Sequence, residues 1–475
     1  MIGAVLLALA ATGASAVTPG APPRVPVTGG IVQGRRASDR LLFRGIPFAA
    51  PPLAPLRWRA PAPVVPWSGV RPAAEVAAPC LQNDYGWNHG DHVLASEDCL
   101  TLDVGTPLLT GKKPVLVWIH GGSNRAGSPG DMIESSIVRR GIVVVGVRYR
   151  LGIFGFLSHR GFGAASGNYG LMDQIAALQW VRDNIARFGG DPDRVTIAGE
   201  SAGAQDVGLL QAAPAARDLF GQAIMESGTP GFGIAWRSLG DAHRIGDQLD
   251  ALLGGVDPRR ASAAALLAAD LKLHDAWLTS DDYLWLRTTL DGAVLTSDPA
   301  SLLRAAPARP LLIGSNAFEL DLPGGRAWRD AFLARSYGAA EDQARRYYGI
   351  EGGRDPVPEP RTGTVDQRIA TDATFACPAY RFAGLAASRG APVWRYLFDG
   401  SPGGGMTGHG RELGYVFGDA RLGALHLQDL WARFISTGDP GGGWPSFPGY
   451  LRLDAGGASP RTDRAPLVCK FAETL

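Results

Sequence analysis

The sequence predicts an α/β fold with a mostly parallel central sheet and helices on both of its faces. Residues 115–119 and 142–147 are uninterrupted apolar runs rich in valine and isoleucine, a pattern typical of parallel strands buried on two sides. Residues 171–188 carry apolar side chains at helical spacing, and two glycines follow where the helix should end. Because strand-like and helix-like segments alternate, one α/β domain explains the pattern better than several modules.

Residues 1–16 have the pattern of a signal peptide. An apolar stretch runs from Ile2 to Ala11 and leads to Ala14-Ser15-Ala16, a small-residue cleavage site. No lysine or arginine precedes that stretch, and an ordinary buried N-terminal helix is the alternative interpretation. We therefore expect a secreted or periplasmic protein whose mature chain, residues 17–475, forms a single domain. No later segment has the roughly 18 uncharged apolar residues of a membrane-spanning helix, so no integral membrane segment is expected.

The other predicted elements follow in chain order. Prolines between residues 51 and 66 exclude a regular helix or a central strand there. Residues 231–305 are rich in alanine and leucine, and we expect them to form a helical insertion that caps the sheet. The remaining predictions are an extended arm over 17–35, strands over 41–47, 195–198, 223–225, 311–313 and 393–397, and a last helix over 425–434.

Charge is nearly balanced along the chain. The 46 Lys and Arg residues and 45 Asp and Glu residues give a net charge of +1. No basic stripe stands out, which argues against a nucleic-acid partner. Nothing in the sequence specifies an oligomeric state.

Four cysteines are present: Cys80, Cys99, Cys377 and Cys469. None has CxxC spacing, which removes the common zinc and thioredoxin interpretations. An even number of cysteines behind a signal peptide favours two disulfides, and the count alone leaves three pairings open.

A candidate nucleophile lies in the motif G-x-S-x-G over residues 199–203. The β-branched run over 195–198 precedes the motif and small residues follow it, so a buried strand should turn abruptly into a helix at Ser201. This arrangement is the nucleophile elbow, in which flanking glycines relieve the crowding around a strained serine.

A serine nucleophile needs a base and an acid that orients the base, and in elbow enzymes these follow in the order serine, acid, histidine. Glu319 and Asp321 both follow the predicted strand at 311–313 and are the acid candidates. His409 lies in a glycine-rich loop suited to delivering an imidazole to a cleft. His426 falls in the last predicted helix, where a packed or solvent-facing side chain is the simpler interpretation.

Oxyanion donors are expected from the segment Ile119-His120-Gly121-Gly122-Ser123, which leaves the strand at 115–119 and fits an HGG-type loop. A plain glycine turn is the alternative. A further donor is the N–H of Ala202, at the start of the elbow helix, where the helix dipole favours negative charge.

Several longer stretches carry a resemblance to a known family. They are residues 43–52 (FRGIPFAAPP), 96–104 (SEDCLTLDV), 149–152 (YRLG), 167–174 (GNYGLMDQ), 189–192 (GGDP), 199–204 (GESAGA) and 409–418 (HGRELGYVFG). Together they cover most of the chain in order, and the chain resembles the type-B carboxylesterases, which include cholinesterases and para-nitrobenzyl esterases.

The resemblance implies an α/β-hydrolase fold with Ser201 as nucleophile, Glu319 as acid and His409 as base. The family's acid lies in a G-x-x-x-x-E-G segment; the spacing from Gly314 to Glu319 is kept, but Leu320 replaces the final glycine, which leaves Asp321 as the alternative.

By the same resemblance the oxyanion loop falls on Gly122 and Ser123. Glu200 is expected either to help order His409 or a water, or to be a turn carboxylate held by backbone donors. Ser227 resembles a serine of the family that supports the acid. The implied disulfides are Cys80–Cys99 and Cys377–Cys469.

The resulting prediction is a serine carboxylic ester hydrolase that forms an acyl-enzyme on a neutral small-molecule ester, with no metal and no organic cofactor. Neutral esters are expected because Trp87, in the short loop between the first two cysteines, is out of register with the choline-binding tryptophan of cholinesterases. The alternatives are a non-catalytic binding or adhesion member of the same fold, which the retained Ser201, Glu319 and His409 argue against, and an amidase.

Overall fold

The computed structural model describes residues 21–163, 167–278, 280–320, 325–350, 354–401, 404–462 and 467–471. The predicted signal peptide lies outside these residues. No helix among them is both long enough and apolar enough to cross a membrane.

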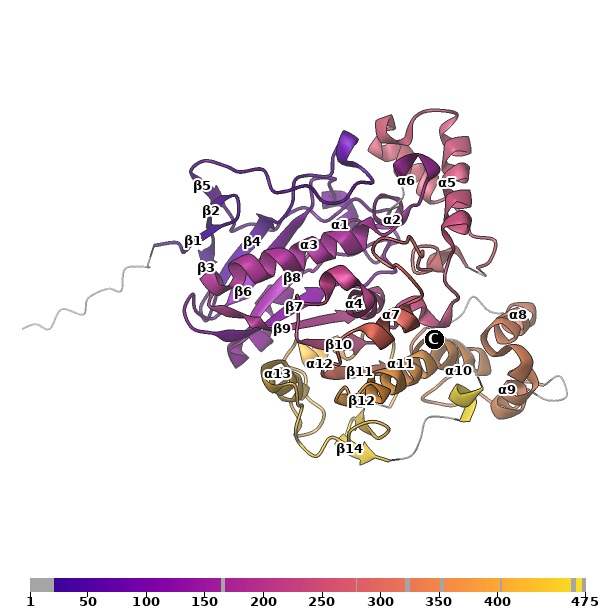
Figure 1. The fold of residues 1–475 in the computed structure, drawn as a ribbon. Helices are drawn as coiled ribbons and strands as arrows, with labels where there is room; N and C mark the ends of the chain where they lie inside the picture. Colours follow the sequence, from indigo (N-terminus) through magenta and orange to yellow (C-terminus); the bar gives the residue numbers. More distant parts are fainter. Residues whose placement is uncertain are drawn as a thin grey trace, which may run out of the picture.

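An 11-stranded sheet forms the centre of the molecule (Figure 1). Seven neighbouring strands in the middle of the sheet pair in parallel. The strands at the two edges pair antiparallel, so the predicted mostly parallel sheet is confirmed. In spatial order the strands are β14 (Gly457–Arg461), β13 (Tyr450–Asp454), β12 (Val393–Asp399), β11 (Leu311–Asn316), β10 (Gln222–Glu226), β9 (Gly190–Glu200), β7 (Lys113–Ile119), β8 (Val143–Val147), β6 (Thr101–Thr106), β4 (Leu41–Pro47) and β3 (Arg35–Arg36).

The apolar runs become central strands because helices cover both faces of the sheet. Along β7, Val115 and Val117 face one buried cluster, whereas Leu116 and Trp118 face the other. The first cluster includes side chains of α3 (Tyr169–Asn184), α4 (Ala202–Ala212), α7 (Pro299–Ala305) and α11 (Cys377–Ser388). The second includes side chains of α12 (Leu413–Val416) and α13 (Leu427–Thr437).

The N-terminal arm is more regular than predicted. β1 (Arg24–Val27) and β2 (Gly30–Gln33) form a hairpin, and β5 (Val70–Pro72) pairs in parallel with β2. The proline-rich stretch between residues 51 and 66 contains only the short 3₁₀ turn η1 (Ala54–Leu56), as its prolines predicted.

The segment 231–305 is only partly helical. It holds α5 (Leu239–Leu253) and α6 (Ala263–Asp270), which lie at the periphery (pink in Figure 1), and α7, but residues 271–278 and 280–298 are mostly irregular. The expectation of a helical insertion was therefore wrong for that stretch. Its buried Trp285 and Leu295 join the same core cluster as α3.

The C-terminal half holds helices that the sequence did not predict: α8 (Arg326–Tyr337), α9 (Glu341–Tyr348), α10 (Val365–Thr371) and α11. They pack around a separate small cluster that contains the disulfide Cys377–Cys469. The second disulfide joins Cys80 to Cys99, so both pairings are those that the resemblance implied. The two other short helices are α1 (His89–Leu94) and α2 (Gly152–Phe156).

Candidate active site

Ser201 lies in a strained turn between β9 and α4. Its φ of 56° and ψ of −124° are unfavourable for a side-chain-bearing residue, and its N–H donates to the Glu226 carbonyl at 2.9 Å, which holds the turn. A Cβ on Gly199 would lie 2.4 Å from Gly203, and a Cβ on Gly203 would lie 2.0 Å from the Ile119 carbonyl oxygen. The two glycines are thus required by close backbone approach, and the turn has the form of a nucleophile elbow.

His409 is held by Glu319 through two contacts. The imidazole Nδ1 is 2.7 Å from Glu319 Oε2, and the His409 N–H donates to the Glu319 carbonyl at 3.1 Å. The other oxygen of the buried Glu319 carboxylate accepts a hydrogen bond from the Asn316 backbone N–H at 2.7 Å. The backbone N–H of Glu319 donates to Thr371 Oγ1. A proton on Nδ1 is fixed by this arrangement, so Nε2 is the nitrogen that can act as a base.

Glu200 faces the opposite edge of the imidazole. Its Oε1 is 3.1 Å from His409 Nε2, and its side chain is largely buried. Burial raises the pKa of Glu200, and the nearby Glu319 raises it further, while His409 lowers it. Of the two expectations for Glu200, this position favours the one in which the carboxylate orders the histidine.

The two carboxylates dominate the electrostatics of the histidine. Burial by itself lowers the pKa of His409, but the charge of Glu200 and the hydrogen bond that the imidazole donates to the Glu319 carboxylate together raise it to about 10. The imidazole therefore binds a proton tightly, because the imidazolium is stabilised between the two carboxylates.

The expected oxyanion loop lies against the elbow. A Cβ on Gly121 would lie 3.0 Å from the Ser201 Cβ, and Gly122 and Ser123 both have positive φ. Within the part of the chain that the structure describes, the N–H groups of Gly122, Ser123 and Ala202 have no hydrogen-bond acceptor. Three unpaired N–H groups beside a serine can donate hydrogen bonds to the negative oxygen of a tetrahedral intermediate.

His120 shapes this loop from inside the protein. Burial lowers the pKa of His120 to about 4, so the ring stays neutral at ordinary pH. Its Nδ1 is 2.9 Å from the Gly121 carbonyl oxygen, its ring stacks on Tyr149, and the Tyr149 hydroxyl donates to the His120 carbonyl.

Glu412 is a buried carboxylate that the sequence analysis did not single out. Ser227 Oγ donates to Glu412 Oε1 at 3.2 Å, and Asn316 Nδ2 donates to Oε2 at 2.8 Å. Ser227 is thus linked to the Glu319 carboxylate through Glu412 and Asn316, and no direct hydrogen bond joins the two side chains among the described residues. Burial, with the charges of Glu319 and Glu200, raises the pKa of Glu412 to about 8. The sequence signal was its position three residues after His409.

The two alternative site residues lie elsewhere. Asp321 falls outside the described residues. His426 precedes α13, a helix that packs on the second face of the sheet, and its ring contacts Arg140.

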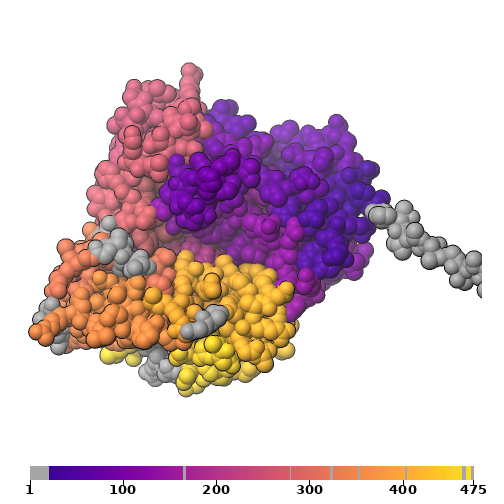
Figure 2. Space-filling view, turned by 180° about the vertical axis from the view of Figure 1, so that it is seen from behind, coloured from indigo at the N-terminus to yellow at the C-terminus, as the bar shows by residue number. Residues whose placement is uncertain are grey.

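Aromatic and charged side chains border the site. A Cβ on Gly122 would meet the Trp87 ring at 3.0 Å, and Trp87 is 61% exposed. The Arg125 guanidinium lies 4.0 Å from the centre of the Tyr85 ring and pairs with Asp282. Figure 2 shows the surface hollowed between the purple segment near residue 90, the pink segment after residue 231 and the orange C-terminal part.

The elbow serine, the acid-bound imidazole and the free N–H groups define a serine hydrolase of the α/β-hydrolase fold. The carboxylesterase family model matches residues 21–458, and the chain belongs to that family. It is a carboxylic ester hydrolase.

Individual relatives agree with this assignment. The chain is 34% identical over 470 residues to the fumonisin B1 esterase of Sphingopyxis macrogoltabida, covering 88% of this chain and 83% of that protein. It is 32% identical to human carboxylesterase 3, covering 94% of this chain and 89% of the relative. A solved structure of a PNB esterase superposes with a TM-score of 0.81 at 30% identity, covering 94% of this chain and 98% of the other.

Proposed function

We propose that Ser201, His409 and Glu319 hydrolyse neutral carboxylic esters through an acyl-enzyme. His409 Nε2 takes the proton of Ser201 as the hydroxyl attacks the ester carbonyl, and the Gly122, Ser123 and Ala202 N–H groups hold the oxyanion. His409 then protonates the departing alcohol. A water molecule, deprotonated by the same imidazole, releases the carboxylic acid and restores Ser201.

The observation that carries this proposal is the 2.7 Å contact between His409 Nδ1 and Glu319 Oε2. It fixes the tautomer in which Nε2 can act as the base, and the contact between Nε2 and Glu200 brings this nitrogen close to the residue that precedes Ser201. A binding or adhesion protein would need neither contact, which argues for catalysis.

The test is covalent labelling. An organophosphate such as paraoxon should phosphorylate Ser201, as located by peptide mapping, and should abolish hydrolysis of p-nitrophenyl acetate.

Substitutions test the same assignment. Ser201→Ala should cost several orders of magnitude in kcat with little change in Tm, whereas Ser123→Ala keeps the backbone donor and should retain most activity. Labelling at another residue with Ser201 untouched contradicts the assignment. Comparing ester and amide analogues separates esterase from amidase.

We also propose that the protein is exported and that its mature chain begins at Val17. Two disulfides support this, because they persist in oxidising compartments. N-terminal sequencing of the protein from a culture of its own host tests the cleavage site, and an intact Met1 contradicts it.

We further propose that residues 17–475 act as one catalytic unit, with 231–305 as a cap. The packing of Leu266 and Trp285 into the main core supports this, since the cap then unfolds together with the sheet. A single calorimetric transition is the expected result, and an independent cap transition contradicts it.

A further inference from the structure

The helix that begins at the elbow carries a buried carboxylate that the proposed mechanism does not use. Asp206 lies on α4, one turn after Ala202, and it is fully buried. Its Oδ1 accepts a hydrogen bond from Asn124 Nδ2 at 3.1 Å, and its Oδ2 accepts one from Gln174 Nε2 of α3 at 2.6 Å. Both partners are amides, so the carboxylate is hydrogen-bonded at each oxygen but its charge is not neutralised.

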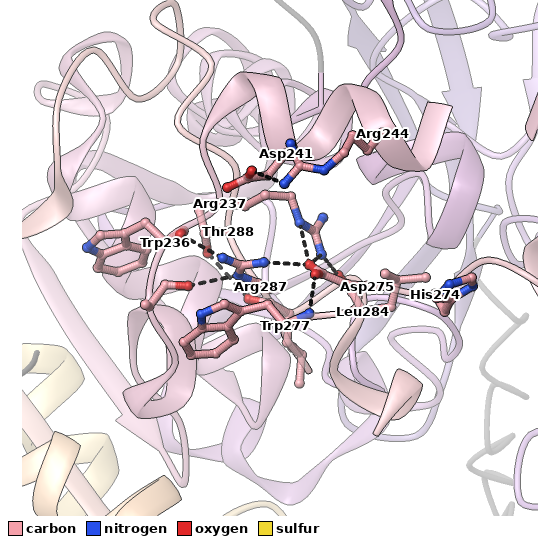
Figure 3. A network of polar contacts seen from close by, with 12 residues as sticks. Trp236, Arg237, Asp241, Arg244, His274, Asp275, Trp277, Leu284, Arg287 and Thr288 are labelled. Atoms are coloured by element: carbon pink, nitrogen blue, oxygen red, sulfur yellow. Dashed lines mark hydrogen bonds and ion pairs between the residues drawn. The ribbon is translucent and has the colours of Figure 1, made fainter. Parts of the chain in front are cut away.

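No cation is paired with this carboxylate. Among the residues that the structure describes, no lysine, arginine or histidine forms an ion pair with Asp206, and burial raises its pKa to about 7. Arg237 and Arg287 line the same small cavity as Asn124, but both bind Asp275, at 3.0 Å and 2.7 Å (Figure 3). A buried acid without a cation is unfavourable for folding, which points to a role for the hydrogen bonds that it makes.

Asn124 directly follows the two oxyanion donors of the loop. Ser123 and Asn124 have φ of 57° and 54°, a left-handed conformation that is unfavourable for residues with a side chain. Gly122 precedes them with a φ of 98°, and its carbonyl accepts from the Arg125 and Ala126 N–H groups. The two loop donors thus lie on a tight turn that needs surrounding contacts to keep its shape.

The Asn124 side chain provides such contacts from inside the protein. Asn124 is fully buried, and its Oδ1 lies 3.3 Å from the Tyr149 hydroxyl oxygen. The Asn124 carbonyl accepts from the Gly152 N–H at 2.7 Å. The bond from Asn124 Nδ2 to Asp206 is the one that leads to α4, the helix whose first residue supplies the third donor, Ala202.

We propose that Asp206 is a positioning residue of the oxyanion hole. By binding Asn124, it holds the two loop N–H groups in place relative to the Ala202 N–H. The inference rests on the proposed function, in which these three groups bind the oxyanion. Donors stabilise one oxygen best when they converge on it before the reaction begins, and here two donors come from a loop and one from a helix. A buried hydrogen bond between loop and helix maintains that convergence.

The test uses an ester pair that reports on the oxyanion itself, p-nitrophenyl acetate and its thiono analogue, in which sulfur replaces the carbonyl oxygen. Sulfur is larger and accepts hydrogen bonds weakly, so a well-formed oxyanion hole favours the oxygen ester. Asp206→Leu should lower kcat for the oxygen ester at least tenfold with little change in KM. It should also lower the oxygen-to-thiono ratio of kcat/KM at least fivefold.

Two further substitutions identify the hydrogen bond responsible. Asn124→Gly removes it from the other side, tolerates the positive φ, and should lower the ratio to the same extent, which provides a second variant if Asp206→Leu does not fold. Because the two residues act through one bond, the double variant should be no worse than either single variant. Asp206→Asn keeps an acceptor oxygen for Asn124 and should restore most of the ratio.

Asp291→Leu is the matched control. Asp291 is also buried, and its Oδ1 accepts from the backbone N–H groups of residues 293–295 instead of from the oxyanion loop. The control variant should therefore lower Tm but leave the oxygen-to-thiono ratio unchanged.

The outcomes separate this inference from the proposed function. An unchanged ratio in Asp206→Leu, an equal fall of the ratio in Asp291→Leu, or additive effects of Asp206→Leu and Asn124→Gly overturns the positioning role alone. Failure of the wild-type protein to hydrolyse p-nitrophenyl acetate, or to be phosphorylated at Ser201 by paraoxon, overturns the proposed function. Equal hydrolysis of the two esters by the wild-type protein overturns the oxyanion assignment on which the inference rests.

Discussion

His409 Nε2 and Glu200 Oε1 lie 3.1 Å apart, on the edge of the imidazole opposite Glu319. The ring is therefore flanked by two carboxylates, and both favour its protonated form. A base placed in this way binds its proton tightly, because the two carboxylates stabilise the imidazolium that forms when Ser201 attacks.

The first prediction concerns the pH dependence. The imidazole must be neutral to act as base, so kcat/KM rises with pH as His409 loses its proton. Glu200 raises that pKa, and Glu200→Gln should therefore move the acidic limb of the profile to lower pH, by about 1 to 3 units. Glu75→Gln, at an exposed carboxylate, should leave the limb in place. An unchanged limb, or a shift to higher pH, would show that Glu200 does not act on the histidine.

The second prediction concerns the acid. Glu319→Gln keeps the shape of the side chain but replaces the carboxylate that fixes the His409 tautomer, so kcat should fall by about three to four orders of magnitude. Asp321→Asn should have little effect on p-nitrophenyl acetate hydrolysis. The reverse pattern in the two variants would transfer the role to Asp321.

The sequence predicted the central strands because their apolar residues form continuous runs along the chain. Val115 and Val143 lie in apolar runs typical of strands buried on both faces, and both are fully buried in paired strands. The elbow and the histidine loop were predictable because their motifs are local.

What the sequence did not predict depends on contacts between distant residues. Glu412 joins the site through Asn316, 96 residues away, and no local pattern encodes that pairing. The segment around Trp277 was expected to be helical as part of the alanine- and leucine-rich stretch 231–305, but it is irregular, and Asp275 there binds Arg237 and Arg287. Tertiary charge pairing overrides local propensity there.

The third prediction concerns the disulfides. They close loops with sequence separations of 19 and 92 residues. By the loss of chain entropy in the unfolded state, removing the first should cost about 3 kcal/mol and removing the second about 4.6 kcal/mol. Denaturant unfolding of Cys80→Ser/Cys99→Ser and Cys377→Ser/Cys469→Ser measures both. Equal stability of all forms contradicts the prediction.

The last prediction is that the enzyme prefers a neutral alcohol group to a cationic one. Trp87 does lie beside Gly122 of the oxyanion loop, where an indole face could attract a quaternary ammonium. The adjacent aromatic Tyr85, however, is already covered by the Arg125 guanidinium at 4.0 Å, which adds positive charge to the same rim. Trp87 is also 61% exposed, and water weakens any cation–π attraction at such a site.

A choline ester and its 3,3-dimethylbutyl isostere differ only in that charge, so their kcat/KM ratio measures it. We expect the neutral ester to be hydrolysed at least as well as the choline ester, and Trp87→Ala to leave the ratio nearly unchanged. Arg125→Gln removes the competing cation and should shift the ratio toward choline, while Arg139→Gln, at a distant exposed ion pair, should not. A strong preference for choline in the wild-type protein that disappears in Trp87→Ala would show instead that Trp87 binds the cation despite Arg125.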